Sequence, residues 1–166
     1  MRLILIIFSL FYTFSTLAQA AELKQQKQLV FKGLKGEHFD LQKSKSQIII
    51  VNFWAYWCPE CIAEMAVLNE LYEKYRQSGL EIVGLSIDKK EERNEAIKRA
   101  GVVSYPNAMA EDASSNNFNE VVQVPMTYIL DQDHRIADVI SKFDESAESL
   151  LRKIVESRYQ TNYTKP

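Results

Sequence analysis

The only two cysteines of this chain lie three residues apart, in the run WCPEC at residues 57–61. A single C-x-x-C pair cannot staple a scaffold together, so these cysteines can only cross-link each other, bind something or carry out redox chemistry. An apolar run that ends at Trp54 precedes the pair, and a helix-like pattern follows it from Pro59 to about Ser78. A buried strand that leads into a helix with C-x-x-C in its first turn favours redox chemistry.

Residues 1–20 have the features of a secretory signal peptide. Arg2 provides a positive start, residues 3–14 are almost entirely apolar, and Ala18-Gln19-Ala20 is an A-x-A cleavage signature. We therefore expect a periplasmic or secreted protein, released by cleavage near Ala20-Ala21. The alternative is a protein anchored by an uncleaved N-terminal segment. An exported C-x-x-C pair meets oxidising conditions and becomes oxidised unless something reduces it.

Composition narrows the class of partner. The formal net charge of the 166-residue chain is −2, and its lysines and arginines form no basic patch, which argues against nucleic acid as a partner. After the leader, no apolar run reaches the length needed to span a membrane. The remainder suits one domain, which we place at residues 29–158, after a polar segment at 21–28 and before a frayed tail at 159–166.

Hydrophobic periodicity predicts an α/β domain. The predicted strands are 29–31, 39–41, 47–54, 80–87, 105–110, 126–130 and 135–140. The predicted helices are 59–78, 90–100 and 145–158, with a helical turn at 114–120. This order predicts a mixed central sheet flanked by helices, with an added N-terminal hairpin that turns around Gly33 and Gly36. Gly79 is expected to cap the first helix at its C-terminal end.

Two blocks resemble the TlpA/ResA-type branch of the thioredoxin-like family. They are VNFWAYWCPECIAEM at residues 51–65 and VPMTYILD at residues 124–131, which is similar to the cis-proline strand of that family. The likeness covers residues 29–155 and implies a thioredoxin-like fold. Asn52 stands where thioredoxin carries a buried Asp, and His134 occupies a turn position that is usually Gly.

The resemblance also implies an activity. Members of the branch are extracytoplasmic thiol–disulfide oxidoreductases that need no cofactor, exchange electrons with protein thiols and disulfides, and receive them from an upstream membrane donor. It suggests a reductant that serves cytochrome c maturation or a similar substrate. We expect the protein to be a monomer. A disulfide oxidase or isomerase is the alternative within the class.

The position of the pair predicts different roles for the two cysteines. We expect Cys58 at the helix N-cap and Pro59 at the first helical position, where the missing N–H of proline costs nothing. Unpaired amides and the helix dipole then favour a thiolate on Cys58, which attacks a partner disulfide, and Cys61 resolves the mixed disulfide. Glu60, in the first turn, disfavours that thiolate and makes the dithiol a better electron donor. Pro59 and Glu60 are thus predicted to tune the redox potential.

Glu64 follows Cys61 by three residues, within one helical turn. In the resembling branch a glutamate at this position helps to move protons for the buried cysteine. A partly desolvated carboxylate has a raised pKa and can accept the thiol proton as Cys61 becomes a thiolate. The alternative is an ordinary exposed glutamate that favours the helix.

Three further residues are predicted to bind the substrate. The resemblance implies that Pro125 follows a cis bond and faces the cysteines, so that the backbone of Val124 can pair with an extended substrate segment as an added strand. The alternative is a proline that simply begins a strand. Trp57 is expected to form an exposed apolar rim, whereas Trp54 is expected in the core.

A metal-binding module or copper chaperone is the alternative of another class. Such a module needs Met or His beside the cysteines, and only Met65 is close. His38 and His134 show no pattern of metal ligands, and Asp131 with Asp133 indicates a hairpin turn rather than a metal loop. We therefore expect no metal. A peroxidase with a lone reactive cysteine in an earlier loop is disfavoured, because the chain has no such cysteine.

Overall fold

The computed structural model describes residues 29–114, 118 and 121–160. The predicted signal peptide, the polar segment 21–28, most of the turn at 114–120 and the chain after residue 160 lie outside these residues. Within them, no helix is both long and apolar enough to cross a membrane.

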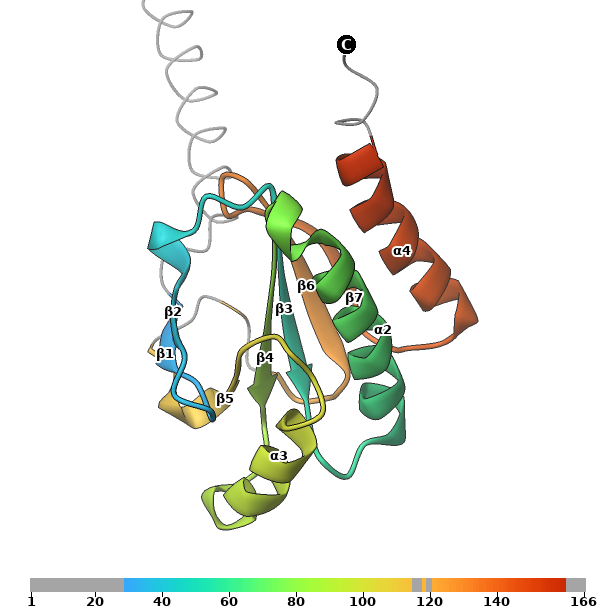
Figure 1. Cartoon of the computed structure of the whole chain (residues 1–166). Helices are drawn as coiled ribbons and strands as arrows, with labels where there is room; N and C mark the ends of the chain where they lie inside the picture. The colour runs from blue at the N-terminus through green and yellow to red at the C-terminus, as the bar shows by residue number, and fades with distance from the viewer. Residues whose placement is uncertain (1–28, 115–117, 119–120, 161–166) are drawn as a thin grey trace, which may run out of the picture.

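A five-stranded sheet forms the centre of the domain (Figure 1). Its strands are β3 (Ile48–Trp54), β4 (Leu80–Ser86), β5 (Asn107–Met109), β6 (Met126–Asp131) and β7 (Ile136–Ile140). They lie in the order β5-β4-β3-β6-β7, with β3, β4 and β5 parallel and with β6 and β7 antiparallel to their neighbours. The predicted mixed sheet is confirmed. Every residue of β3 is buried, as expected for a strand that is apolar at every position except Asn52.

Three helices pack on one face of this sheet: α2 (Pro59–Tyr75), α3 (Arg93–Ala100) and α4 (Glu145–Gln160). Met65, Leu68 and Leu71 of α2 lie in the same core as Ile48 and Ile50 of β3. The α-helix ends at Tyr75, three residues before the predicted end, and continues as the 3-10 turn η2 (Arg76–Ser78). Gly79 caps this turn with a φ of 97°, a left-handed conformation that favours glycine.

The two other predicted helices also differ from the structure at one end. The segment predicted as one helix at 90–100 begins as the 3-10 turn η3 (Lys90–Glu92), and α3 starts only at Arg93. Helix α4 runs two residues past its predicted end. Tyr159 is buried there, because its ring stacks on Tyr75 at 5.2 Å and its hydroxyl donates to the carbonyl of Gly79 at 2.8 Å.

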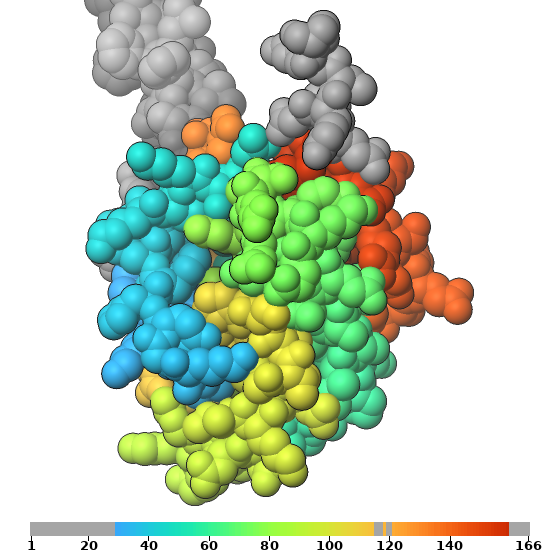
Figure 2. Space-filling model, in the orientation of Figure 1, coloured from blue at the N-terminus to red at the C-terminus, as the bar shows by residue number. Residues whose placement is uncertain are grey.

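The predicted N-terminal hairpin is present and consists of β1 (Val30–Lys32) and β2 (His38–Asp40). Phe31 and Phe39 stack on each other and pack on the second face of the sheet. At the hairpin tip, the N–H of Leu34 donates to the carbonyl of Asn107 on β5, and the Lys35 ammonium donates to the carbonyl of Val103. Figure 2 shows the hairpin against this part of the chain. The hairpin thus shields the β5 edge, where an exposed strand could pair with another chain.

Gly84 lies at the tightest point of the sheet. It pairs with Asn52 on β3 and Asn107 on β5. A β-carbon at residue 84 would overlap the side-chain oxygen of Asn107 and lie 2.9 Å from Trp54 Nε1. Because the side chains of Asn107 and Trp54 fill this space, the position requires a residue without a side chain.

We expect Gly84→Ala to lower the free energy of unfolding of the oxidised protein by about 1–3 kcal/mol, since the added methyl group overpacks the core. Urea unfolding followed by circular dichroism measures this change. Ala137→Ser, at an exposed site on β7, is the control and should stay within about 0.5 kcal/mol of wild type. A wild-type midpoint for Gly84→Ala would contradict the close packing of Asn107 and Trp54 around residue 84.

Candidate active site

The loop from β3 to α2 brings the cysteines to the start of a helix, at the lower edge of the sheet in Figure 1. Strand β3 ends at Trp54, and the chain turns so that the N–H of Cys58 donates to the carbonyl of Ala55 at 3.2 Å. Cys58 is the N-cap of α2, with extended backbone angles, and Pro59 is the first helical residue. Both predicted positions are confirmed.

Cys58 and Cys61 form a disulfide. The sulfur of Cys58 accepts a hydrogen bond from the N–H of Cys61 at 3.1 Å, which satisfies one of the free amides of the first turn. Cys58 keeps 5% of its surface exposed, whereas Cys61 has none. Of the two cysteines, only Cys58 therefore has any surface that a partner could contact.

A buried carboxylate lies on the same helix, one turn below the disulfide. Glu64 has no exposed surface, so the alternative of an ordinary exposed glutamate is wrong. Its Oε2 accepts from the side-chain amide of Asn52 at 2.9 Å, and its Oε1 accepts from the hydroxyl of Thr127 at 2.8 Å. The Asn52 amide also donates to Thr127 Oγ1 at 2.9 Å. Burial raises the pKa of Glu64 to about 7, although the bonds from Thr127 and Asn52 lower it in part.

The sequence did not reveal Asn52 and Thr127 as the partners of Glu64. They meet because β3 and β6 pair with Asn52 opposite Thr127, on the face that α2 covers. One signal was available: Asn52 is the only polar residue in a seven-residue strand that is otherwise apolar. A polar side chain in such a strand needs a buried hydrogen-bond partner.

The predicted substrate-binding residues lie at the same end of the sheet. The Val124–Pro125 peptide bond is cis, as predicted. It precedes β6, whose first residue, Met126, pairs with Phe53 just before β3 ends. Val124 is partly buried and Pro125 is buried. Trp57 is 58% exposed, and Trp54 is fully buried, as expected.

Two charged residues lie near the first turn of α2. Glu60 is exposed. Lys142, in the loop between β7 and α4, has a raised pKa, mainly because of its ion pair with Asp144 at 2.7 Å and to a smaller extent because of Glu60. The sequence did not predict that Lys142 lies within electrostatic range of the active-site helix, since it is far from Glu60 along the chain.

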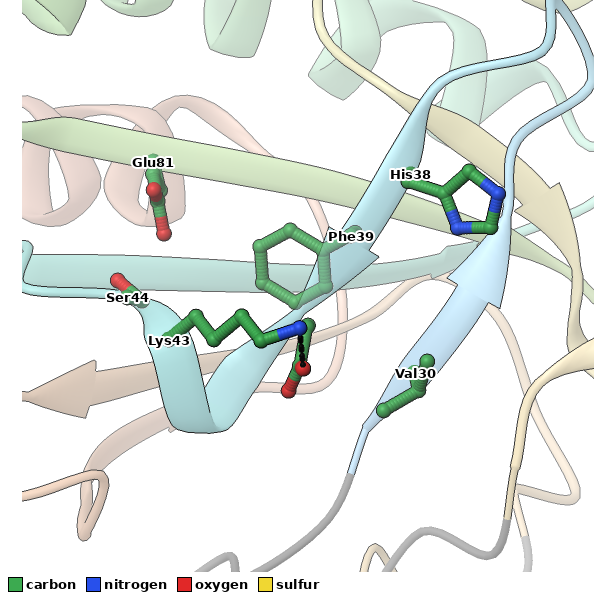
Figure 3. Close-up of a pocket in the computed structure, with 7 residues that line it drawn as sticks. Val30, His38, Phe39, Lys43, Ser44 and Glu81 are labelled. Atoms are coloured by element: carbon green, nitrogen blue, oxygen red, sulfur yellow. Dashed lines mark ion pairs between the residues drawn. The ribbon is translucent and has the colours of Figure 1, made fainter.

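A pocket of about 370 Å³ lies beside the N-terminal hairpin and the start of β4 (Figure 3). Phe39, Lys43 and Glu81 are among the residues that line it, and Lys43 forms an ion pair with Asp40. Glu81 pairs with Ile49 near the start of β3, whereas the cysteines follow the end of that strand. This pocket is therefore separate from the redox site. Among the described residues, no group of three or more His, Cys, Asp and Glu could hold a metal ion.

Comparison with known proteins agrees with this geometry. The model of the AhpC/TSA family matches residues 17–155. The chain belongs to the AhpC/TSA family. The chain is a thioredoxin-like thiol–disulfide oxidoreductase, and its predicted resemblance to proteins of the ResA type is confirmed.

Two relatives of this AhpC/TSA protein show the extent of the sequence similarity. The thiol-disulfide oxidoreductase ResA of Bacillus thuringiensis subsp. konkukian (strain 97-27) is 27% identical over 150 residues, which cover 89% of this chain and 87% of the relative. The thioredoxin-like protein YneN of Bacillus subtilis (strain 168) is 32% identical over 111 residues, which cover 65% of this chain and 64% of the relative.

Solved structures of low identity share the fold. A thiol:disulfide interchange protein of the thioredoxin family from Chlorobium tepidum TLS has a TM-score of 0.65 at 19% identity and covers 81% of this chain and 95% of its own. StoA from Bacillus subtilis has a TM-score of 0.56 at 17% identity and covers 74% and 92%. The thioredoxin-like fold predicted for the chain is thus confirmed.

The raised pKa of Glu64 predicts a pH-dependent stability. Because the folded state holds the Glu64 proton up to about pH 7, against an ordinary pKa of 4.5, the free energy of unfolding should fall as pH rises between these values. The total loss is up to about 3 kcal/mol at 1.36 kcal/mol per pKa unit. Glu64→Gln escapes this loss, so the oxidised variant should be more stable than wild type at pH 8 and similar near pH 4.

Urea unfolding at a series of pH values measures the difference. Glu73→Gln, at an exposed position on the same helix, is the control and should follow the wild-type curve. Parallel curves for wild type and Glu64→Gln would show that Glu64 titrates like an exposed carboxylate.

Proposed function

We propose that the protein is an extracytoplasmic reductant of protein disulfides that cycles Cys58 and Cys61 between dithiol and disulfide. One observation carries the proposal: Cys58 caps α2 with part of its surface exposed, and a buried carboxylate lies one turn below. A purely structural disulfide needs no buried acid one turn below it. No cofactor is required for the exchange.

The exchange proceeds in two steps. The Cys58 thiolate attacks one sulfur of the partner disulfide, forming a mixed disulfide and releasing the other partner sulfur as a thiolate, which takes a proton from water. Cys61 then gives its thiol proton to the carboxylate of Glu64 and attacks the sulfur of Cys58. The second partner sulfur leaves as a thiolate. The partner gains two electrons, and this protein becomes the disulfide seen in the structure.

Glu64 suits the second step because its pKa, raised by burial to about 7, lies near neutral pH. A general base works best when its pKa is close to the working pH, because it can then both accept and release the proton. Asn52 and Thr127 hold both carboxylate oxygens in place, so that the base does not swing away from the helix.

The surface around Cys58 supports a protein as the partner. Trp57 offers an exposed apolar ring beside the first cysteine, and Val124 with Pro125 stands at the same end of the sheet. We propose that an extended partner segment pairs with the backbone of Val124 and packs on Trp57. An exported protein whose disulfide must be reduced fits this role, and an apocytochrome c is one example.

The export signature of residues 1–20 supports a periplasmic or secreted location. In such a compartment an outside source must regenerate the dithiol, so we propose a membrane protein as the electron donor. We propose that the protein acts as a monomer.

The division of labour between the cysteines can be tested by trapping. Cys61→Ser should accumulate mixed disulfides with partner proteins, because the resolving thiol is missing, whereas Cys58→Ser should accumulate none. Non-reducing electrophoresis after expression in the native organism, followed by mass spectrometry of the adducts, measures both. Adducts on Cys58→Ser alone would reverse the assignment of the cysteines.

The direction of transfer can be tested through the redox potential. Glu60 is exposed in the first turn of α2, where its charge disfavours a thiolate on Cys58. We expect a potential closer to that of thioredoxin, about −270 mV, than to that of DsbA, about −120 mV. Glu60→His should raise it. Equilibration with glutathione or dithiothreitol buffers measures the potential, and a wild-type value near the DsbA end would contradict the reductant role.

A further inference from the structure

A buried carboxylate stands behind the loop that presents Cys58. Asp88 follows β4 and is 5% exposed. Its Oδ2 accepts hydrogen bonds from the backbone N–H of Tyr56 at 3.0 Å and from the hydroxyl of Ser86 at 2.7 Å. The backbone N–H of Asp88 donates to Ser86 Oγ at 3.1 Å, which fixes the pair. The other oxygen of Asp88, Oδ1, is buried and has no hydrogen-bond partner in the described part of the chain.

The hydrogen bond from Tyr56 to Asp88 lies just beyond the end of the β3–β4 pairing. The parallel pairing of β3 with β4 ends with Trp54 opposite Ser86, and the last backbone bond runs from the N–H of Ile87 to the carbonyl of Trp54 at 2.9 Å. Beyond it the two strands diverge. The side chain of Asp88 then provides the acceptor for Tyr56, and two residues later the first cysteine begins α2.

The segment between β4 and α3 also binds the side chain of Tyr56. The hydroxyl of Tyr56 donates to Glu92 Oε1 on η3 at 3.4 Å. Two carboxylates from the segment between β4 and α3 therefore hold the backbone and the ring of one loop residue. Such a loop can move less freely than one that is held only at its ends.

Burying the Asp88 carboxylate costs more free energy than burying a neutral acceptor at the same place. A neutral acceptor such as Asn could take the hydrogen bond from Tyr56 without placing a carboxylate in the interior. A backbone amide left without a partner at this place would also be unfavourable. Asp88 instead accepts a hydrogen bond from the backbone N–H of Tyr56, which lies in the loop that leads to the disulfide.

We propose that Asp88 is a positioning residue for thiol–disulfide exchange: through the Tyr56 amide it fixes the loop before Cys58 and so sets where the Cys58 sulfur lies at the start of α2. The proposal rests on Cys58 being the attacking cysteine, as proposed above. Exchange requires the attacking sulfur to approach the partner disulfide along a narrow path, so a loosened loop lowers the fraction of productive encounters.

Two substitutions separate the hydrogen bond from the rest of the side chain. Asp88→Asn keeps an oxygen that can accept from Tyr56, and Asp88→Ala removes it. A matched control is available in Asp131, whose Oδ1 accepts from the N–H groups of Asp133 and Arg135 at 2.9 Å. Asp131 pairs with Ile48, at the end of β3 away from the cysteines.

The measurements are amide hydrogen exchange at Tyr56 in the oxidised protein and the rate at which the reduced protein reduces insulin disulfides. For Asp88→Ala we expect Tyr56 exchange at least tenfold faster and kcat/KM for insulin at least fivefold lower. Asp88→Asn should stay within about twofold of wild type in both, since a neutral acceptor retains the bond. Asp131→Ala should reduce insulin at the wild-type rate.

Each remaining outcome decides the proposal. A wild-type insulin rate or a wild-type rate of Tyr56 exchange in folded Asp88→Ala overturns it, and so does an Asp88→Asn variant as slow as Asp88→Ala. If Asp88→Ala does not fold, Ser86→Ala, which removes the hydroxyl that orients Asp88, takes its place. At least threefold faster Tyr56 exchange and slower insulin reduction are then expected, and wild-type values for both overturn the proposal.

A wild-type protein that fails to reduce insulin contradicts the proposed function instead. The preference of iodoacetamide for Cys58 over Cys61 in the reduced protein then tests Asp88 separately. Asp88→Ala should reduce this preference at least threefold relative to Asp88→Asn, and equal preferences overturn the proposal.

Discussion

Strand β3 is the element on which the rest of the structure depends. It pairs with β4 on one side and β6 on the other, and all seven of its residues are buried. A strand that is paired along both edges and covered on both faces has a fixed register, because a slip of one residue would exchange its two faces. That register determines where the strand ends, at Trp54, and therefore where the C-x-x-C pair meets the start of α2.

Strand β3 also supplies a buried polar side chain beneath the active site. Asn52 faces α2 from the centre of β3, and its amide joins Glu64 of α2 to Thr127 of β6. Each oxygen of the Glu64 carboxylate accepts a hydrogen bond there, which makes the buried carboxylate tolerable. The side-chain oxygen of Asn52 has no partner in the described part of the chain. The arrangement explains how Glu64, whose pKa is raised to about 7, can stay buried one turn below the disulfide.

Local patterns predicted most of the elements, because their signals lie within single segments. The apolar run of β3, Pro59 after Cys58 and the left-handed Gly79 each report on their own surroundings. Boundaries that depend on distant partners were less predictable. Tyr159 extends α4 only because Tyr75 and the carbonyl of Gly79 are there to receive it.

By itself, the sequence determined the chemistry: two cysteines, their spacing, the helix that begins between them and the acid one turn later are all local facts. The tertiary structure alone decided how that chemistry is controlled. The burial of Glu64 and its hydrogen-bond partners depend on the pairing of β3 with β6. The hydrogen bond from Tyr56 to Asp88 likewise joins two segments that are distant in the sequence. Hydrogen bonds of this kind need precise distances in space, and a linear pattern of residues does not contain those distances.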